Sequence, residues 1–212
     1  MTPNQQSRPT HLSKLDSYPV ETPFAYRGGE LICEYVPVAA IAAATDTPVY
    51  VYSTAAFMGR AEGYLQAARD VSGNGASVCY ALKANANPTI LRMLFAAGLG
   101  ADVTSGGELF LARHAGAEPQ KIIFSGVGKT SNEIAEALSA GIRAIHAESE
   151  MELAAVASVA EQMGVIAPVG VRVNPNIDAV THPYISTGLR GHKFGVSRET
   201  AITMYRFALG HE

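Results

Sequence analysis

The 212-residue sequence has few cysteines, no excess of basic side chains and no long apolar run, and each of these deficits excludes a class of protein. Two cysteines are too few for the disulfide framework of a small secreted domain. Sixteen basic and nineteen acidic side chains give a net charge of −3, so no nucleic-acid partner is expected. No run reaches the roughly 18 apolar residues of a membrane span. These absences predict a cytoplasmic protein that does not bind membranes.

Residues 1–23 also lack the apolar core of a secretory signal peptide, and Asp16 and Glu21 are atypical of an organellar transit peptide. We expect this stretch to be a flexible N-terminal arm. The remainder has the composition of a folded protein, because 48% of all residues are hydrophobic and only 17% are charged. A sizeable buried core is therefore expected after residue 24.

Short apolar segments alternate with helix-like segments along most of the chain. Strands are predicted at 77–82, 101–103, 121–124, 142–146 and 169–173, and helices at 88–98, 106–116, 131–140, 149–163 and 197–208. Strands that are apolar throughout and are separated by helices indicate parallel βαβ units covered on both faces. A further strand at 48–52 and a helix at 54–71 are expected before them.

Capping signals support these helices. Three pairs fit the S/T-x-x-E capping box, namely Ser105 and Glu108, Thr130 and Glu133, and Ser149 and Glu152. Glycines stand where four of the helices should stop, at Gly98, Gly116, Gly141 and Gly164. The predicted fold class is α/β. Units of near-equal length favour a (β/α)8 barrel, of which about five units are present, and a closed barrel needs roughly 80 residues more. The alternative is an open five-stranded sheet.

Lys83 is the most informative candidate site residue. It ends the apolar strand that begins at 77, and an Asn-rich turn leads from it to a helix opened by Pro88. Parallel α/β folds place their chemistry at this end of the strands. A partly desolvated amine there can form a Schiff base with an aldehyde. The alternative is a lysine whose stem packs on the strand end while its ammonium reaches water.

Two further strand ends carry polar groups. Asp102 ends the next strand, and a charge at that position needs a partner or a function. Its strand lies beside the one that leads to Lys83, so a lysine–carboxylate pair is expected there. The segment Ser125–Thr130 resembles a phosphate loop, but Ile123 stands where the full motif requires glycine. A nucleotide triphosphate site is therefore the weaker hypothesis.

The long polar segment 174–195 contains His182, Tyr184 and Lys193, and it follows a strand that carries Arg172. About twenty non-repetitive residues inside a compact α/β fold are typical of a binding loop or a disordered one, and the apolar residues among them favour a binding loop. His182 and His192 have no carboxylate or cysteine at ligand spacing, so no metal site is predicted.

These segments together resemble the diaminopimelate decarboxylases, which are pyridoxal-phosphate enzymes with an alanine-racemase-like barrel and a second β domain. The resemblance covers about 24–212 and rests on three motifs. They are Y-A-L-K-A-N around Lys83, D-V-x-S-x-G-E from Asp102, and H-P-Y-I-S-T-G from His182 followed by Lys193-Phe194-Gly195. The resemblance implies that Lys83 binds pyridoxal 5′-phosphate covalently and that Asp102 orients or tunes this lysine.

The resemblance further implies that Arg172 and Lys193 lie near the cofactor and that His182 and Tyr184 shape the substrate side. The implied reaction is loss of CO2 from meso-diaminopimelate to give L-lysine, in a homodimer of the full-length enzyme. The family's ring-stacking histidine, phosphate loop and proton donor come later in the chain. Residues 24–212 are therefore expected to be the N-terminal part of the barrel domain, without the C-terminal β domain and inactive alone. A non-catalytic cofactor-binding module and a related basic-amino-acid decarboxylase are the alternatives.

Overall fold

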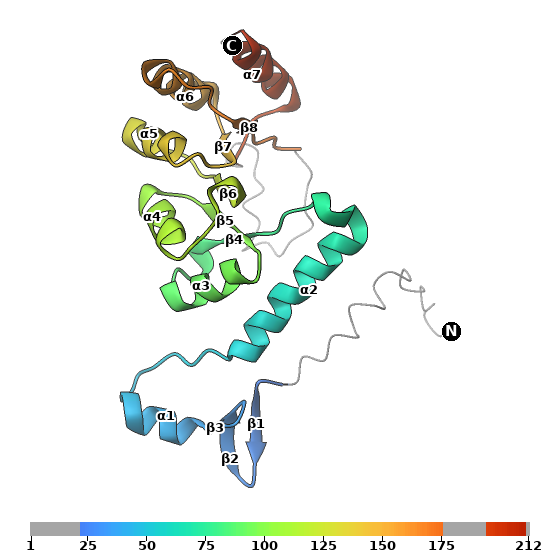
Figure 1. The fold of residues 1–212 in the computed structure, drawn as a ribbon, viewed down its shortest axis with the longest axis vertical. Coiled ribbons are helices and arrows are strands. Elements are labelled where there is room, and N and C mark those ends of the chain that lie inside the picture. The colour runs from blue at the N-terminus through green and yellow to red at the C-terminus, as the bar shows by residue number, and fades with distance from the viewer. Residues whose placement is uncertain (1–21, 176–193, 211–212) are drawn as a thin grey trace, which may run out of the picture. The chain divides into compact units, whose positions relative to one another are not determined.

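The chain divides into two compact units, Met1–Val78 and Cys79–Glu212. The computed structural model describes residues 22–78 of the first unit and residues 79–175 and 194–210 of the second (Figure 1). No helix in these ranges is long and apolar enough to cross a membrane. The predicted arm at 1–23 lies almost entirely outside the described residues, and the predicted domain that begins at residue 24 stays a prediction.

The first unit contains a three-stranded antiparallel sheet and two α-helices. Its elements are β1 Phe24–Arg27, β2 Glu30–Cys33, β3 Val36–Pro37, α1 Val38–Thr45, α2 Thr54–Ser72 and the short 3-10 helix η2 Gly73–Gly75. The turn between β1 and β2 is Gly28-Gly29, with φ values of 60° and 86° that a two-residue hairpin of this kind requires. Ser53 caps α2 and also donates a hydrogen bond to Glu34 Oε1 (2.7 Å), which ties the helix to the end of β2.

The predicted strand at 48–52 is wrong, whereas the predicted helix at 54–71 is confirmed as α2. Residues 48–52 have no regular secondary structure and link α1 to α2. A strand needs a neighbour that accepts its backbone hydrogen bonds, and neither sheet of the described chain pairs with this segment. The β-propensity of valine and tyrosine is too small to create a strand without that partner.

The second unit is built on a parallel sheet whose strands follow one another in chain order. The strands are β4 Cys79–Ala81, β5 Gly100–Val103, β6 Ile122–Phe124, β7 Ala144–Ala147 and β8 Val169–Val171, in the order β4-β5-β6-β7-β8. The five predicted strands are thus confirmed, with bounds that differ from the predicted ones by at most two residues. A doubly wound sheet reverses its strand order at a switch point, and this sheet does not. The sequential order is that of a (β/α) barrel.

The helices of the second unit alternate with its strands as predicted. They are α3 Pro88–Ala96, α4 Gly106–His114, α5 Ser131–Ser139, α6 Glu150–Met163 and α7 Arg198–Leu209, with short 3-10 helices η3 Leu82–Ala84 and η4 Pro119–Lys121. Each of α3 to α7 packs against the next, and Figure 1 shows α3 to α6 along the same side of the sheet. The fold class α/β is therefore confirmed.

The strands alternate between two faces, which differs from the prediction of strands that are apolar on both. Ala101 and Val103 of β5 are fully buried towards the helices, as are Ile122 and Phe124 of β6. The residue between each pair is only half-buried, and in β5 that residue is Asp102. A strand places successive side chains on opposite faces, so one face of the sheet forms the core and the other carries polar groups.

The predicted capping residues accept the expected bond from the third residue of each helix, at 3.2 to 3.3 Å. Only Thr130 and Glu133 form the complete reciprocal box. In the other two pairs the glutamate accepts from the residue before the cap and not from the cap. Glu108 Oε2 accepts from Thr104 N (2.6 Å), and Glu152 Oε2 accepts from Glu148 N (2.7 Å). These bonds fix the residues that follow β5 and β7. The four predicted helix-ending glycines all have positive φ values.

Candidate active site

Lys83 lies in η3, directly after β4 and next to Leu82, whose side chain is fully buried. The turn beyond it is held by side-chain-to-backbone bonds: Tyr80 Oη donates to the carbonyl of Asn85 (3.2 Å), and Asn85 Oδ1 accepts from the amide of Asn87 (2.9 Å). Asn87 in turn caps α3. The lysine itself is exposed. The turn therefore presents an accessible amine at the carboxyl end of the first strand, where the sequence predicts it. Its exposure matches the alternative of an ammonium that reaches water and not the expected partly desolvated amine.

A cavity of about 680 Å³ lies at this end of the sheet. Polar residues from the carboxyl ends of all five strands line it, and they are Lys83, Asp102, Thr104, Ser125, His146, Glu148 and Arg172. The volume is within the range of small-molecule and cofactor sites. Parallel strands bring their carboxyl ends to one edge, so residues about 90 positions apart in the sequence face one cavity.

Asp102 contributes a buried carboxylate oxygen to this cavity. It lies opposite Ala81 of β4 and Ile123 of β6 in the sheet. Its Oδ1 is buried and has no hydrogen-bond partner among the described residues. Lys83 and Asp102 line the same cavity, as predicted, but they form no ion pair in the described part of the chain. A buried acceptor without a partner is costly, and a bound ligand with a donor would satisfy it.

Arg172 lies after β8 and forms an ion pair with Glu148, with 2.9 Å between Nη1 and Oε1. Its guanidinium also stands over the ring of Phe194 at 5.2 Å. The Glu148 side chain is only 1% exposed, and its second oxygen, Oε2, has no hydrogen-bond partner among the described residues. The cavity thus holds two buried acceptor atoms, Asp102 Oδ1 and Glu148 Oε2, that the described chain leaves unpaired.

Ser125 and His146 form a further polar contact in the cavity. The serine Oγ lies 3.2 Å from Nδ1 of the histidine. Burial lowers the pKa of His146, an effect opposed first by the charge of Asp102 and reinforced by the charge of Lys129. This shift favours the neutral form of the imidazole.

The lysine of the predicted phosphate loop has a different environment. The Lys129 side chain is 1% exposed, and its Nζ donates to the carbonyl of Gly126 (2.6 Å) and the carbonyl of His146 (2.8 Å). Its third bond goes to Glu152 Oε1 (2.9 Å). An ammonium group has three donors, and these contacts use all three. Lys129 is thus committed to linking the ends of β6 and β7, and a phosphate would find no donor on it.

Three predicted site residues, His182, Tyr184 and Lys193, lie outside the described residues. Four polar cavity residues have no role in the sequence-based predictions, namely His146, Glu148, Thr104 and Tyr205. The alternation of β-strands offers a signal for three of them. His146 and Glu148 have the spacing that places side chains on one face of a strand and its extension. Thr104 stands two residues beyond Asp102 and obeys the same rule.

Residues 61–211 match the pyridoxal binding domain of the pyridoxal-dependent decarboxylase family. The chain belongs to this family. The cofactor predicted from the sequence, pyridoxal phosphate, is therefore the one that this domain binds. The match includes Lys83 and every cavity residue named above.

Several diaminopimelate decarboxylases are similar in sequence and structure. The protein from Aquifex aeolicus is 43% identical over 183 residues, which are 86% of this chain and 42% of that protein. The protein from Pseudomonas aeruginosa is 44% identical over 182 residues, which are 86% and 43%. The chain therefore spans less than half the length of these relatives.

Two solved structures show the same arrangement of elements. Diaminopimelate decarboxylase from M. jannaschii in complex with L-lysine has a TM-score of 0.81 at 36% identity, with 90% of this chain and 45% of that chain covered. The enzyme from Helicobacter pylori, also complexed with L-lysine, has a TM-score of 0.71 at 40% identity, with 80% and 42% covered. The chain is thus a diaminopimelate decarboxylase-like pyridoxal-binding domain.

The residues of the cavity fit the cofactor of this family. An accessible primary amine, Lys83, can hold an aldehyde, and the cavity is large enough for a ring with a phosphate group. Asp102 Oδ1 and Glu148 Oε2 are acceptors in need of donors. Arg172, still 47% exposed beside Glu148, retains donors that an anionic group could use.

Proposed function

We propose that this chain forms the cofactor-holding part of a diaminopimelate decarboxylase, which removes CO2 from meso-diaminopimelate to give L-lysine. The observation that carries the proposal is Lys83, an exposed amine at the mouth of a cavity whose buried carboxylate oxygens have no partner in the described chain. The sequence identity to diaminopimelate decarboxylases and the L-lysine complexes of two relatives support the choice of substrate.

In this proposal each predicted site residue acts on the cofactor, on the lysine that holds it, or on the substrate. Lys83 supplies the amine that holds the cofactor, and Asp102 orients that amine from the neighbouring strand. Arg172, fixed by Glu148, and Lys193 bind the cofactor, while His182 and Tyr184 lie on the substrate side. When bound, pyridoxal phosphate supplies an electron sink for the carbanion left by the departing CO2.

We assign the complete decarboxylation reaction to the whole protein. The similar diaminopimelate decarboxylases are more than twice as long as the segment that this chain matches. We propose that the whole protein is a cytoplasmic homodimer, and that the described chain contributes the capture of the cofactor at Lys83. The proposal for the chain can therefore be tested without measuring decarboxylation.

The test is borohydride reduction after incubation with pyridoxal phosphate, followed by peptide mass mapping. We expect the label at Lys83 and none at Lys129, whose three donors are occupied. Lys121, which is accessible and bonded to Glu118, is the internal control for nonspecific reaction. A label spread evenly over Lys83 and Lys121 would refute the proposed site. For the whole protein, release of L-lysine from meso-diaminopimelate rather than product from ornithine or arginine would settle the substrate.

A further inference from the structure

His146 lines the cofactor cavity, and the proposed function gives it no role. It stands on β7 and points to the polar face of the sheet, between the buried Ile145 and Ala147. Its Nδ1 is held by Ser125 Oγ at 3.2 Å. The other ring nitrogen, Nε2, has no hydrogen-bond partner in the described ranges 22–175 and 194–210. The ring therefore has one anchored nitrogen and one nitrogen available to a ligand.

Gly170 of β8 provides the space that the ring occupies. The two residues are paired across the sheet, and a Cβ added to Gly170 would lie 2.8 Å from Cδ2 and 3.3 Å from Nε2 of His146. Carbon atoms in ordinary contact are about 3.5–4.0 Å apart. All three nearest atoms to that added Cβ belong to the imidazole. The glycine thus seats the ring against β8, and any larger residue would move it.

Charged groups face the imidazole from every element around it. Asp102 of β5 and Glu148 after β7 favour its protonated form, whereas Lys129 before α5 and Arg172 after β8 oppose that form. Burial is the largest influence and lowers its pKa. One nitrogen of a neutral imidazole carries a proton and the other accepts. If Ser125 donates to Nδ1, the proton is on Nε2, and Nε2 is then a donor suited to an anionic oxygen.

We propose that His146 is a further cofactor-binding residue, which donates a hydrogen bond from Nε2 to an anionic oxygen of pyridoxal phosphate. The proposal rests on the proposed function, because it requires the cofactor to occupy this cavity. Two groups of the cofactor have this chemistry, the phosphate and the phenolic oxygen of the ring. The same contact would hold the cofactor over the strand ends while the Lys83 amine binds it.

The test measures the concentration of pyridoxal phosphate that half-saturates borohydride trapping at Lys83. His146→Leu removes both ring nitrogens and is expected to raise this concentration roughly tenfold, the usual effect of one hydrogen bond to a charged group. His146→Gln keeps an N–H donor and should recover part of the loss. His114→Gln is the matched control, because His114 lies on the exposed side of α4, stacked on Phe110.

Gly170→Ala gives an independent steric test. The added methyl group displaces the imidazole, so this variant should also raise the half-saturating concentration severalfold. If Gly170 acts only through the imidazole of His146, the double variant His146→Leu/Gly170→Ala should bind pyridoxal phosphate no more weakly than His146→Leu alone. Gly107→Ala is its control, since a Cβ there meets nothing closer than 3.8 Å. Circular dichroism melting of each variant shows that it is folded at the assay temperature.

The outcomes separate this inference from the proposed function. Selective trapping at Lys83 that is equal in wild type, His146→Leu and Gly170→Ala would overturn the inference and leave the proposed function intact. An equal loss in His114→Gln or Gly107→Ala would also overturn it. Absence of selective trapping at Lys83 in the wild-type chain would refute the proposed function and the inference with it. Repeating the series with pyridoxal, which lacks the phosphate, assigns the oxygen: a His146→Leu effect that persists points to the ring oxygen, and one that disappears points to the phosphate.

Discussion

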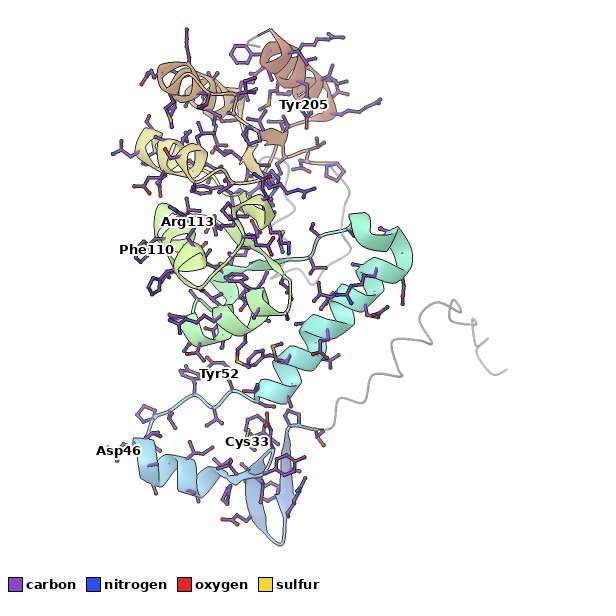
Figure 2. The ribbon with its side chains drawn as sticks, in the orientation of Figure 1. Cys33, Asp46, Tyr52, Phe110, Arg113 and Tyr205 are labelled. Carbon is purple, nitrogen blue, oxygen red and sulfur yellow. The ribbon has the colours of Figure 1, made fainter. Side chains whose placement is uncertain are left out.

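The loop after β4 and the loop after β6 both place a lysine beyond the end of a parallel strand, and the two lysines have opposite surroundings. Lys83 is exposed at the cavity and forms no ion pair within the described chain. Lys129 is almost fully buried, and all its donors are bonded to protein. Figure 2 shows the described side chains as sticks, including Tyr205 of α7, which lines the same cavity as Lys83. A lysine is therefore available for chemistry when the fold leaves its donors unused, and the glycine-rich sequence around Lys129 is the weaker guide.

Replacing the two lysines by methionine should separate these roles most clearly. Lys83→Met should abolish trapping of pyridoxal phosphate and change the free energy of unfolding by no more than about 0.5 kcal/mol, because the side chain is exposed. Peptide mapping and urea denaturation of the same preparation measure both quantities. Trapping that continues at the wild-type level in this variant would mean that another amine holds the cofactor.

Lys129→Met, in contrast, should strongly lower the free energy of unfolding. Its removal leaves Glu152, whose side chain is 9% exposed, as an unpaired buried charge, and breaking a buried pair costs about 3–5 kcal/mol. Urea denaturation beside Lys83→Met tests this, since the two variants have the same replacement. The double variant Lys129→Met/Glu152→Gln should recover part of the loss, because it removes the unpaired charge. A loss below about 1 kcal/mol would contradict the assigned structural role.

The difference between Lys83 and Lys129 also shows which features of the structure can be predicted from the sequence alone. The five parallel strands and the helices of the second unit follow from apolar segments and capping residues, and those predictions are confirmed. The position of Lys83 directly after a strand is a local property of the sequence, and the structure confirms that position. The environment of Lys129 depends on Glu152 and on the carbonyl of His146, which are 23 and 17 residues away. Such contacts are set by the register of neighbouring strands, which no local pattern encodes.

Most of the wrong and incomplete predictions also concern features that depend on contacts between distant parts of the chain. The predicted strand at 48–52 lacks a pairing partner, and pairing is a tertiary property. The capping glutamates Glu108 and Glu152 bond to Thr104 and Glu148 rather than to the cap itself. Their cap residues are more extended, with φ of −155° against −79° at Thr130. His146 belongs to none of the sequence motifs, so the sequence does not mark it as a site residue. Only the alignment of β7 with β6 and β8 places it beside Ser125 and Gly170.

The two loops can be compared again at the helix caps that follow them. Asn87 caps α3 after the Lys83 loop, and Thr130 caps α5 after the Lys129 loop. Asn87→Ala and Thr130→Ala should each cost about 1 kcal/mol in the free energy of unfolding. Only Asn87→Ala should also weaken trapping at Lys83, by a fewfold, because losing the side-chain cap on Thr89 N loosens the start of α3, to which the Lys83 turn is joined. Equal weakening by both variants would show that the loss of stability, and not the turn, controls the amine.

The smallest expected effect concerns Glu133, whose carboxylate links the starts of α4 and α5. It accepts from the amide of Gly106 (2.7 Å) and from the amide of Thr130 (2.9 Å), and these bonds hold its pKa below the ordinary value of 4.5. A carboxyl group with a lowered pKa stabilises the fold above the pKa of the unfolded chain, and this contribution is lost as the pH falls through the folded-state pKa. Glu133→Gln cannot ionise, so the stability advantage of wild type over this variant should be present at pH 7 and shrink as the pH falls below 4.5. Urea denaturation of both proteins across this pH range measures the difference. An advantage that stays constant or grows on acidification would mean that the ionised carboxylate does not stabilise the junction of the two helices.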